Sequence, residues 1–187
     1  MKKIIPEETG KKPYQSPAQD LYERFEFRNI RPEEAEQAAE IERICFPPNE
    51  ACSRERIFER VAAAPELFLV AADKQTGRLA GFLNGLSTEE TSFRDEFFTD
   101  ITLYHPEGKT IMLLGLDVLP EYRRQGLGRE LMNHYLCRER QNGRRCILLT
   151  CLQPKVEMYK KMGFCDNGIA NSSWGGEEWH EMSHMIQ

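Results

Sequence analysis

One segment of the sequence, residues 111–129, constrains the fold more than any other. It begins with nine residues, 111–119, that are apolar apart from Asp117 and a lone glycine, Gly115. A continuous apolar run is typical of a central strand with both faces covered, and a lone glycine inside it favours a bulge or a close ligand contact. A proline ends the strand, and a glycine-containing turn leads into residues 127–142, whose apolar residues have helical spacing. The segment therefore predicts a strand, a turn and a helix in direct succession.

The rest of the chain alternates between short predicted strands and helices. Continuous or alternating apolar runs predict strands at 25–30, 67–72, 78–86, 146–151, 164–171 and 177–185. Helical spacing, with capping residues or prolines at the ends, predicts helices at 32–45, 53–63, 127–142 and 155–162. This order is that of an α/β protein with a mixed sheet. Residues 88–105 form a long acidic loop, which suits either a substrate lid or a loosely packed insertion.

Length and composition indicate one soluble domain. The 187 residues, with 40% hydrophobic and 29% charged residues, are enough for a single hydrophobic core. Residues 1–20 are polar and rich in proline and lysine, so we expect a flexible N-terminal arm followed by the domain at 21–187. No apolar run approaches the roughly 20 residues of a membrane helix, and no export signal is visible. These features favour a cytoplasmic protein with no membrane partner.

The cysteines and histidines suggest neither disulfides nor a metal. The six cysteines form no C-x-x-C pair and lie mainly in apolar surroundings, which is typical of reduced core residues. Cys151 remains a candidate nucleophile, although a thiolate requires a basic neighbour that a sequence does not display. His180 and His184 have the i, i+4 spacing of metal ligands, but their segment alternates like a strand. We therefore expect no metal site.

Positive charge is concentrated around the glycine-containing turn, although the whole chain has a net charge of -5. Residues 121–145 contain seven arginines and three glutamates, a local excess of four positive charges. So small a basic island suits a small polyanion better than a nucleic acid, which requires a broader basic face. The backbone of the turn suits a phosphate, because N–H groups at the start of a helix attract anions and Gly126 and Gly128 permit close approach.

The turn also carries a family signature. Residues 118–128 contain Val-x-Pro and then the spacing (R/Q)-x-x-G-x-(G/A), which resembles motif A of the GNAT superfamily of N-acetyltransferases. The resemblance implies the GNAT fold, a mixed and mostly antiparallel sheet of six to seven strands flanked by about four helices. It also implies acetyl-CoA as cosubstrate, with its pantetheine arm along the preceding strand and its pyrophosphate in the turn. The residues implied in binding are Leu116, Asp117, Val118, Arg123, Arg124, Gln125, Gly126, Leu127, Gly128 and Arg129.

A second segment, residues 156–164, resembles the Y-x-(K/R)-x-G-F element of the same family. The tyrosine of that element stands near the thioester sulfur, so the resemblance implies Tyr159 as the general acid that protonates the departing thiolate. A phenol titrates near pH 10 and a thiol near 8.5, so the donor helps only if it is held close to the sulfur. The alternative role of Tyr159 is aromatic packing on the final strands.

Local matches at residues 41–46 and 101–108 extend the resemblance toward the arylalkylamine, or serotonin, N-acetyltransferase branch. The animal enzymes of that branch relay a proton through two histidines in the central strand. Met112 and Leu114 stand at those positions here, so the resemblance supplies no general base. The candidates among lone ionisable residues are Glu96, His105, Glu107 and His180.

The expected activity is transfer of an acetyl group from acetyl-CoA to the primary amine of a small molecule, by direct attack within a ternary complex. Such an enzyme needs neither a metal nor a protein nucleophile, and we expect a monomer or homodimer without a nucleic-acid partner. Two alternatives stay open: a protein or peptide N-acetyltransferase, which needs an open groove, and a non-catalytic CoA-binding regulatory module. The aromatic residues at 88–105 favour a covered pocket and therefore a small acceptor.

Overall fold

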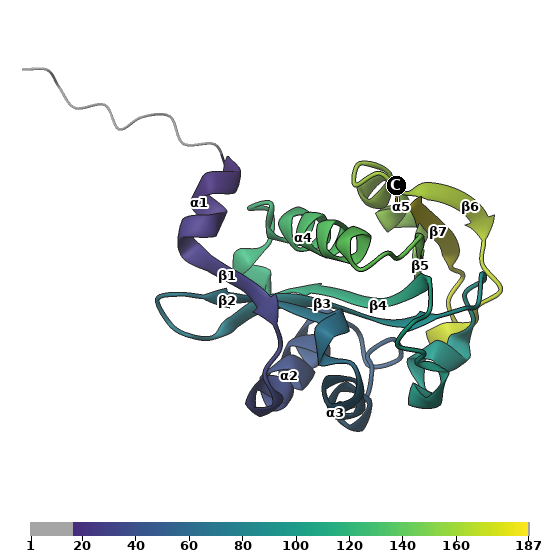
Figure 1. Ribbon diagram of the computed structural model, residues 1–187, viewed down its shortest axis with the longest axis horizontal. Coiled ribbons are helices and arrows are strands. Elements are labelled where there is room, and N and C mark those ends of the chain that lie inside the picture. The colour runs from purple at the N-terminus through teal and green to yellow at the C-terminus, as the bar shows by residue number, and fades with distance from the viewer. Residues whose placement is uncertain (1–16, 187) are drawn as a thin grey trace, which may run out of the picture.

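The computed structural model describes residues 17–186, in which helices lie on both sides of a central sheet (Figure 1). The strands are β1 (Phe25–Asn29), β2 (Phe68–Asp73), β3 (Leu79–Thr88), β4 (Thr110–Val118), β5 (Cys146–Cys151), β6 (Cys165–Ile169) and β7 (His180–Met185). The α-helices are α1 (Pro17–Arg24), α2 (Ala35–Cys45), α3 (Arg54–Ala63), α4 (Leu127–Gln141) and α5 (Gln153–Lys160). The 3₁₀ helices are η1 (Pro32–Glu34), η2 (Pro65–Leu67), η3 (Asp95–Phe98), η4 (Ile101–Leu103), η5 (Pro120–Tyr122) and η6 (Trp174–Gly176). None of these helices has both the length and the apolar character of a membrane span.

The seven strands of residues 17–186 form one sheet in the order β1-β2-β3-β4-β5-β7-β6. Neighbouring strands are antiparallel except β4 and β5, which run parallel and are connected through α4. A helical crossover is the usual way to join parallel neighbours. The expected fold class is therefore confirmed, with five α-helices in the described part where about four were expected.

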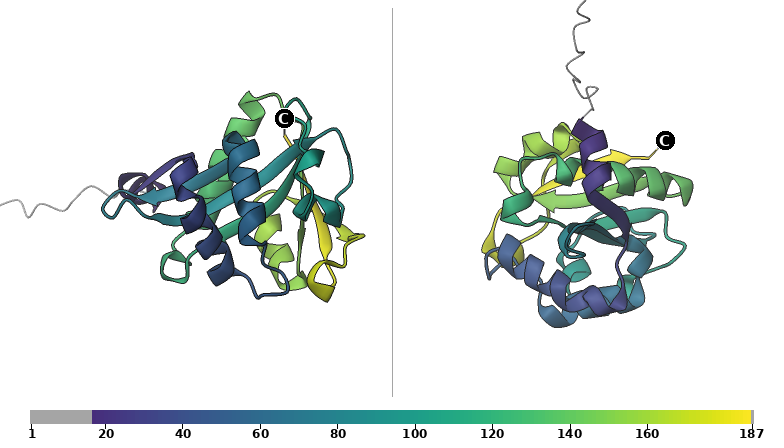
Figure 2. Two further views of the ribbon diagram at one scale, coloured as in Figure 1. Left: turned by 90° about the horizontal axis from the view of Figure 1, so that it is seen from below. Right: turned by 90° about the vertical axis from the view of Figure 1, so that its left-hand side faces the viewer.

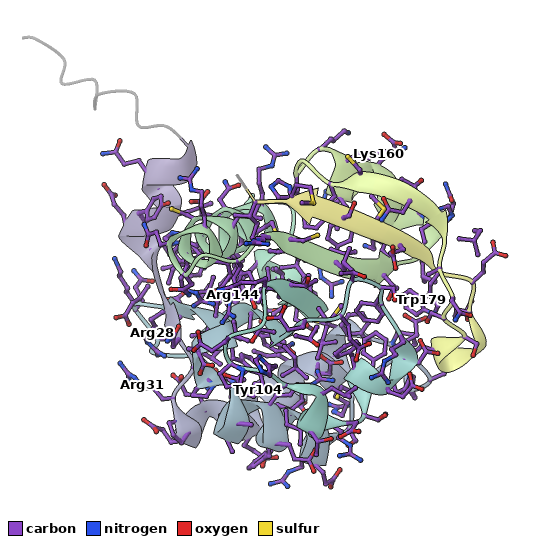
Figure 3. All side chains as sticks on the ribbon, turned by 45° about the vertical axis from the view of Figure 1, so that its right-hand side comes forward. Arg28, Arg31, Tyr104, Arg144, Lys160 and Trp179 are labelled. Atoms are coloured by element: carbon purple, nitrogen blue, oxygen red, sulfur yellow. The ribbon has the colours of Figure 1, made fainter. Side chains whose placement is uncertain are left out.

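Each face of the sheet has its own layer of helices. Figure 1 and Figure 2 show α4 and α5 on one face and α2 and α3 on the other. Leu131 and Tyr135 of α4 are buried on the first face, and Ile41 of α2 and Ile57 of α3 are buried on the second. Side chains fill the space between the sheet and both helix layers (Figure 3). Both faces of the central strand β4 are thus covered, as its continuous apolar sequence predicts.

Helix α1 was not among the expected elements, because residues 1–20 were predicted to form a flexible arm. Residues 17–20 belong to α1, and residues 1–16 of the predicted arm lie outside the described residues. α1 has eight residues, of which Leu21 is buried against the core. So short a helix gives only a weak periodic signal, and tertiary contacts supply most of its stability.

The segment at 88–105 is packed onto the domain through η3 and η4. Phe93 and Phe97 are buried, at 4% and 1% exposure, and Phe98 is half-buried. Phe93 N–H donates to Glu181 Oε2 of β7 at 3.2 Å. These contacts exclude the loosely packed insertion and leave a fixed cover on the α2–α3 face of the sheet.

Candidate active site

The candidate site begins where β4 and β5 diverge. β4 pairs with β5 over residues 110–112 only, whereas its pairing with β3 continues to Val118. From Leu113 onward, the β4 edge that faces β5 has no strand partner among the described residues. A register shift against β3 leaves Leu114 as an extra residue beside Gly115, which is the bulge predicted from the lone glycine. The result is an opening in the sheet, bordered by free backbone.

Two residues of β4 direct their backbone groups into this opening. The carbonyl oxygen of Asp117 lies directly against Gly81 of β3. Because successive residues of a strand turn their backbone groups to opposite edges, Leu116 and Val118 face the opening instead. The Val118 carbonyl accepts a hydrogen bond from Arg123 Nε at 2.8 Å. The Val118 N–H and both backbone groups of Leu116 therefore line the opening, and the Asp117 backbone does not.

The turn between β4 and α4 has the backbone of an anion site. Gly126 caps α4 with a φ of 88°, which glycine adopts without strain, and no side chain caps the helix. Arg124 also has a positive φ, 60°, which is uncommon for a residue with a Cβ. Leu127 is buried in the core, so the helix start is fixed while its first N–H groups point outward. The side chains exposed around it are those of Arg123, Arg124, Gln125 and Arg129.

Helix α1 supports this turn from outside. The guanidinium of Arg24 lies 5.0 Å from the ring centroids of both Phe25 and Tyr122. Its Nη1 donates to Gln125 Oε1 at 3.4 Å, although the two residues are 101 positions apart. Sequence reasoning missed this support, because a contact between distant segments leaves no local pattern.

Tyr159 lies in α5, close to both diverging strands. Its side chain is 8% exposed, and its ring packs edge-on against Phe164 with centroids 5.7 Å apart. Burial, followed by the electrostatic effects of Cys151 in β5 and Asp117 in β4, raises the pKa of Tyr159 above its ordinary value. The hydroxyl therefore carries its proton at neutral pH, as a proton donor must.

Cys151, the alternative nucleophile, has the properties of a core residue. Burial, followed by the charge of Asp166, raises the pKa of its thiol to about 11. A thiol that keeps its proton at neutral pH is a poor nucleophile, which favours the structural role. Within residues 17–186, no cluster of three or more His, Cys, Asp and Glu side chains is arranged to hold a metal ion.

The four candidates for the general base lie in different places. His105 and Glu107 are exposed just before β4, and the His105 N–H donates to the carbonyl of Ser87 in β3 at 2.8 Å. His180 begins β7, where its Nδ1 lies 3.1 Å from Asp166 Oδ1. Glu96 is exposed in η3 and lines a pocket. The four candidates thus lie on three separate parts of the fold, namely the segment before β4, the start of β7 and η3.

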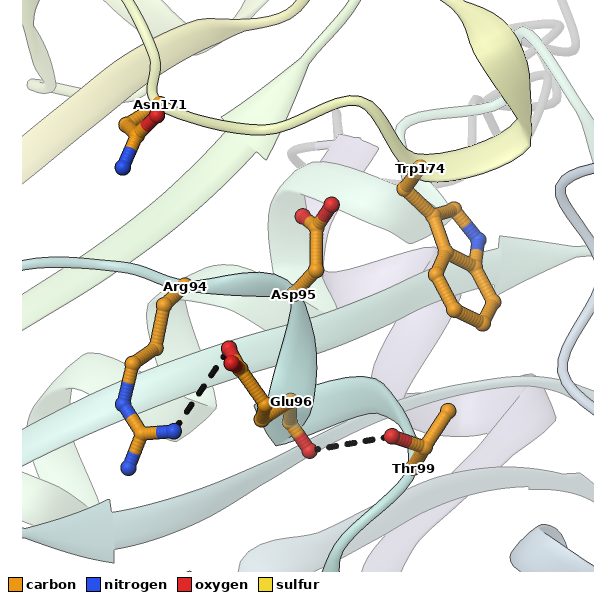
Figure 4. Close-up of a pocket in the computed structure, with 6 residues that line it drawn as sticks. All are labelled: Arg94, Asp95, Glu96, Thr99, Asn171 and Trp174. Carbon is orange, nitrogen blue, oxygen red and sulfur yellow. Dashed lines mark hydrogen bonds and ion pairs between the residues drawn. The ribbon is translucent and has the colours of Figure 1, made fainter.

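The pocket lies between η3 and the loop from β6 to β7, and its volume is about 420 Å³ (Figure 4). It is lined by Arg94, Asp95, Glu96, Thr99, Asn171 and Trp174. Trp174 Nε1 donates to the Glu50 carbonyl at 2.8 Å, and its ring lies 4.8 Å from that of Phe98. Asp95 accepts from the Ser173 N–H at 3.0 Å. Three segments far apart in the sequence are thus joined beside the pocket, and η3 in turn packs against β4.

Known proteins resemble this chain in sequence and in fold. The family model described as the acetyltransferase (GNAT) family matches residues 35–164, which is more than half of the chain. The chain belongs to the GNAT acetyltransferase family. Serotonin N-acetyltransferase from Mesocricetus auratus is 32% identical over 143 residues, which cover 74% of this chain and 67% of that relative. This match supports the predicted resemblance to the arylalkylamine branch.

Solved GNAT structures show the same fold. The loading GNATL domain of CurA from Lyngbya majuscula superposes with a TM-score of 0.77 at 15% identity, over 87% of this chain and 98% of that one. YncA from Salmonella typhimurium, a putative acetyltransferase solved with its cofactor acetyl-CoA, has a TM-score of 0.62 at 15% identity, over 87% and 94%. The family and the curated relative make this chain an acetyltransferase that uses acetyl-CoA.

The acetyltransferase lacks the two histidines of the arylalkylamine branch. Met112 and Leu114, which stand in their place, are buried apolar side chains. Asp117 is then the ionisable side chain of β4, whose other residues are apolar apart from Thr110. A proton that leaves an acceptor must therefore go to Asp117, to a group on another element or to solvent.

Proposed function

We propose that this acetyltransferase moves the acetyl group to the primary amine of a small molecule, by direct attack within a ternary complex. The observation that carries the proposal is the opening between β4 and β5. It brings together the uncapped start of α4, the backbone of Leu116 and Val118, and the neighbourhood of Tyr159. These features suit a coenzyme that has phosphates at one end, amides along its arm and a thioester at the other end.

Each part of the site then has one role. The pyrophosphate binds the N–H groups at the start of α4, with positive charge from Arg123, Arg124 and Arg129. The pantetheine arm lies along β4 and bonds to the backbone as an added strand would. Tyr159 donates a proton to the sulfur that leaves when the amine nitrogen attacks the acetyl carbon. Holding both substrates in one geometry supplies a large part of the rate enhancement.

The pocket in Figure 4 supports a small amine as the acceptor. Its volume of about 420 Å³ falls in the range of small-molecule sites. Asp95, Glu96 and the ring of Trp174 line it together with Arg94, whose Nη1 lies 3.5 Å from Glu96 Oε2, and carboxylates and an aromatic face both attract an ammonium group. The bond from Asn49 Nδ2 to the Gly175 carbonyl, 2.9 Å, joins the loop between α2 and α3 to the loop between β6 and β7.

A turnover screen tests this proposal. The purified chain is incubated with acetyl-CoA and single acceptors from three classes, namely arylalkylamines, polyamines and peptides, and release of free thiol is measured. We expect turnover with small primary amines and little with peptides. Turnover with peptides alone would instead assign a protein N-acetyltransferase. Binding of acetyl-CoA without turnover of any acceptor would assign a CoA-binding module.

A further inference from the structure

Four polar side chains from four different elements meet beneath Gly115, on the α2–α3 face of the sheet. They are Glu42 of α2, Arg60 of α3, Asn84 of β3 and Asp117 of β4, with exposures of 4%, 4%, 1% and 0%. A Cβ on Gly115 would lie 2.9 Å from Asp117 Oδ2, 3.0 Å from Asn84 Nδ2 and 3.6 Å from Glu42 Oε2. The absence of a side chain at Gly115 therefore lets these three atoms converge on one point.

The polar atoms that converge there lack hydrogen bonds. Glu42 Oε1 accepts from the Cys52 N–H at 2.8 Å, and Asn84 Oδ1 accepts from Arg60 Nη1 at 3.1 Å. Within residues 17–186, no well-aligned hydrogen bond reaches Glu42 Oε2, Asn84 Nδ2 or either carboxyl oxygen of Asp117, although the Cys45 thiol lies beside Asp117. Buried polar atoms are almost always satisfied, so each of these four atoms requires an explanation.

Protonation of one of the two carboxyls explains the free carboxyl oxygens. Arg60 makes its hydrogen bonds to the neutral oxygens Asn84 Oδ1 and Phe98 O, at 3.1 and 2.9 Å, rather than to a carboxylate. Two ionised carboxylates beside each other and out of water would be strongly destabilised, and a proton on one of them removes most of that cost. A protonated carboxyl also becomes a donor, which can satisfy an oxygen of its neighbour.

The electrostatic surroundings agree with a protonated carboxyl. Burial, followed by the charge of Glu42, raises the pKa of Asp117 well above its ordinary value. Burial likewise raises the pKa of Glu42. The other titratable or charged groups that act on the two carboxyls are Cys45, Cys52, Arg60, Arg123 and Tyr159.

We propose that Glu42 and Asp117 hold one proton between them in the resting enzyme, and that the pair takes up the proton released from the acceptor amine. The proposal rests on the proposed function for the nature of the acceptor. In this proposal Asp117, which lies between Leu116 and Val118, helps to accept the proton that two histidines relay in the arylalkylamine branch. Both carboxyls are fully buried, so they act through an intervening group and are positioning residues.

A protonated amine loses two protons when its nitrogen bonds to the acetyl carbon and the carbon–sulfur bond breaks. One of these protons ends on the coenzyme sulfur, by way of Tyr159. The second must leave the nitrogen, and in our proposal it passes to the doubly ionised form of the carboxyl pair and from there to solvent. The pair can accept it only after losing its own shared proton, so activity should rise with pH.

The experiment compares Asp117→Asn and Glu42→Gln with the wild type, and uses Asp73→Asn as a matched control. Asp73 is also a buried aspartate, at 2% exposure, but it accepts from the N–H groups of Gln75 and Thr76 at 2.9 and 3.3 Å and from Arg24 Nε at 3.4 Å. We expect kcat to fall about a hundredfold in both cluster variants and the pH-dependent rise of kcat/KM to disappear. In Asp73→Asn the shape of the pH profile should not change.

Infrared spectroscopy provides a readout that needs no turnover. A protonated carboxyl has a carbonyl stretch that a carboxylate lacks, and we expect this band at neutral pH in the wild type and in Asp73→Asn. It should shift in Asp117→Asn and in Glu42→Gln, because each variant leaves the remaining buried carboxyl beside an amide instead of a second carboxyl. If no band is present in the wild type, or if both cluster variants keep the wild-type pH profile, the proposal is wrong. Failure to acetylate any amine would refute the proposed function and the uptake step, while the band alone would still decide whether a proton is shared.

Discussion

The turn at residues 123–128 and the carboxyl cluster beneath Gly115 are two polar sites that arise in opposite ways. The turn is one continuous, exposed segment whose backbone points its N–H groups at solvent. The cluster combines residues from four elements, all at 4% exposure or less. A phosphate site can therefore be built from local sequence, because it uses backbone and a helix start. A buried proton site exists only once the sheet and both helices of one face are in place.

The two sites also differ in the partners that their unpaired polar atoms require. The free N–H groups of the turn are in contact with water until an anion replaces it, so an empty turn costs little. The free oxygens of Asp117 are out of water, so they require a partner or a proton within the fold. Substitutions in the turn should therefore change binding, whereas substitutions in the cluster should change proton transfer and the response of stability to pH.

The largest expected effect is that of Gly126→Val on coenzyme binding. A β-branched residue at a φ of 88° is strained, and its side chain would stand among the N–H groups of the phosphate site. We expect the affinity for acetyl-CoA, measured by calorimetry, to fall about a hundredfold, which is about 2.8 kcal/mol.

Gly143→Val is the matched control for strain. Gly143 also has a positive φ, 72°, with nothing within 4 Å of a Cβ there, and it follows the other end of α4. Both valine variants should lose about 1–3 kcal/mol of unfolding free energy, but Gly143→Val should bind acetyl-CoA normally. Equal affinities in the two variants would mean that the turn has a structural role only.

The next effect is that of Tyr159→Phe on turnover. The variant keeps the ring that packs against Phe164 and removes the proton, so we expect kcat to fall about tenfold or more at neutral pH, with the affinity for acetyl-CoA unchanged. Tyr135→Phe is the control, because the Tyr135 hydroxyl donates to the Leu67 carbonyl at 3.1 Å in the core. It should cost stability, about 1–3 kcal/mol, and leave kcat unchanged. If Tyr159→Phe instead lowers only the stability and leaves kcat unchanged, Tyr159 has a packing role in the core and is not the proton donor.

The contrast between the two sites also explains how far the sequence alone could go. The apolar run predicted β4 as a covered strand, and its lone glycine favoured a bulge or a close ligand contact, of which the structure shows a bulge at Leu114. Hydrophobic periodicity is a local property, so it gave the order of strands and helices, and that order predicted the mixed sheet. Ser53 was correctly placed as the cap of α3, where it accepts from the Arg56 N–H.

What the sequence did not predict depends on contacts between distant segments. Glu42, Arg60 and Asn84 look like ordinary polar residues of amphipathic elements, and nothing near them in the chain indicates that they surround Asp117. Helix α1 was missed because its support of Gln125 through Arg24 spans 101 positions. The family resemblance implied Asp117 only as a backbone contact of the coenzyme. A strand pattern does not show that the Asp117 side chain lies near another buried carboxyl, that of Glu42.

A third effect concerns stability as a function of pH. The pKa values of Asp117 and Glu42 are raised in the folded state, so the folded chain binds more protons than the unfolded chain above about pH 4. The stability that these protons bring is present below pH 4 and is lost as pH rises toward the folded pKa values. The slope cannot exceed about 1.4 kcal/mol per pH unit for each proton. Asp117→Asn should flatten this loss in urea unfolding experiments between pH 4 and 9, and parallel curves would contradict the shared proton.

The smallest effect is that of Arg124→Gly. Glycine relieves the strain of a positive φ, 60°, so the unfolding free energy should stay the same or rise slightly. Loss of an exposed charge beside the phosphate should weaken acetyl-CoA binding by about three- to tenfold at low salt, and the difference should shrink as salt screens the charge. An affinity equal to that of the wild type at low salt would remove Arg124 from the coenzyme site.

The most direct test of the central claim follows the acetyl group itself. The chain is incubated with acetyl-CoA labelled with carbon-13 in the acetyl group and with the best small amine of the turnover screen, and the products are analysed by mass spectrometry. Our account predicts one labelled acetyl group on the amine nitrogen for each free thiol released, and about a tenth of this product or less with Tyr159→Phe over the same short time. Thiol release without a labelled amine, or transfer of the label to the protein alone, would contradict direct acetyl transfer to a small amine.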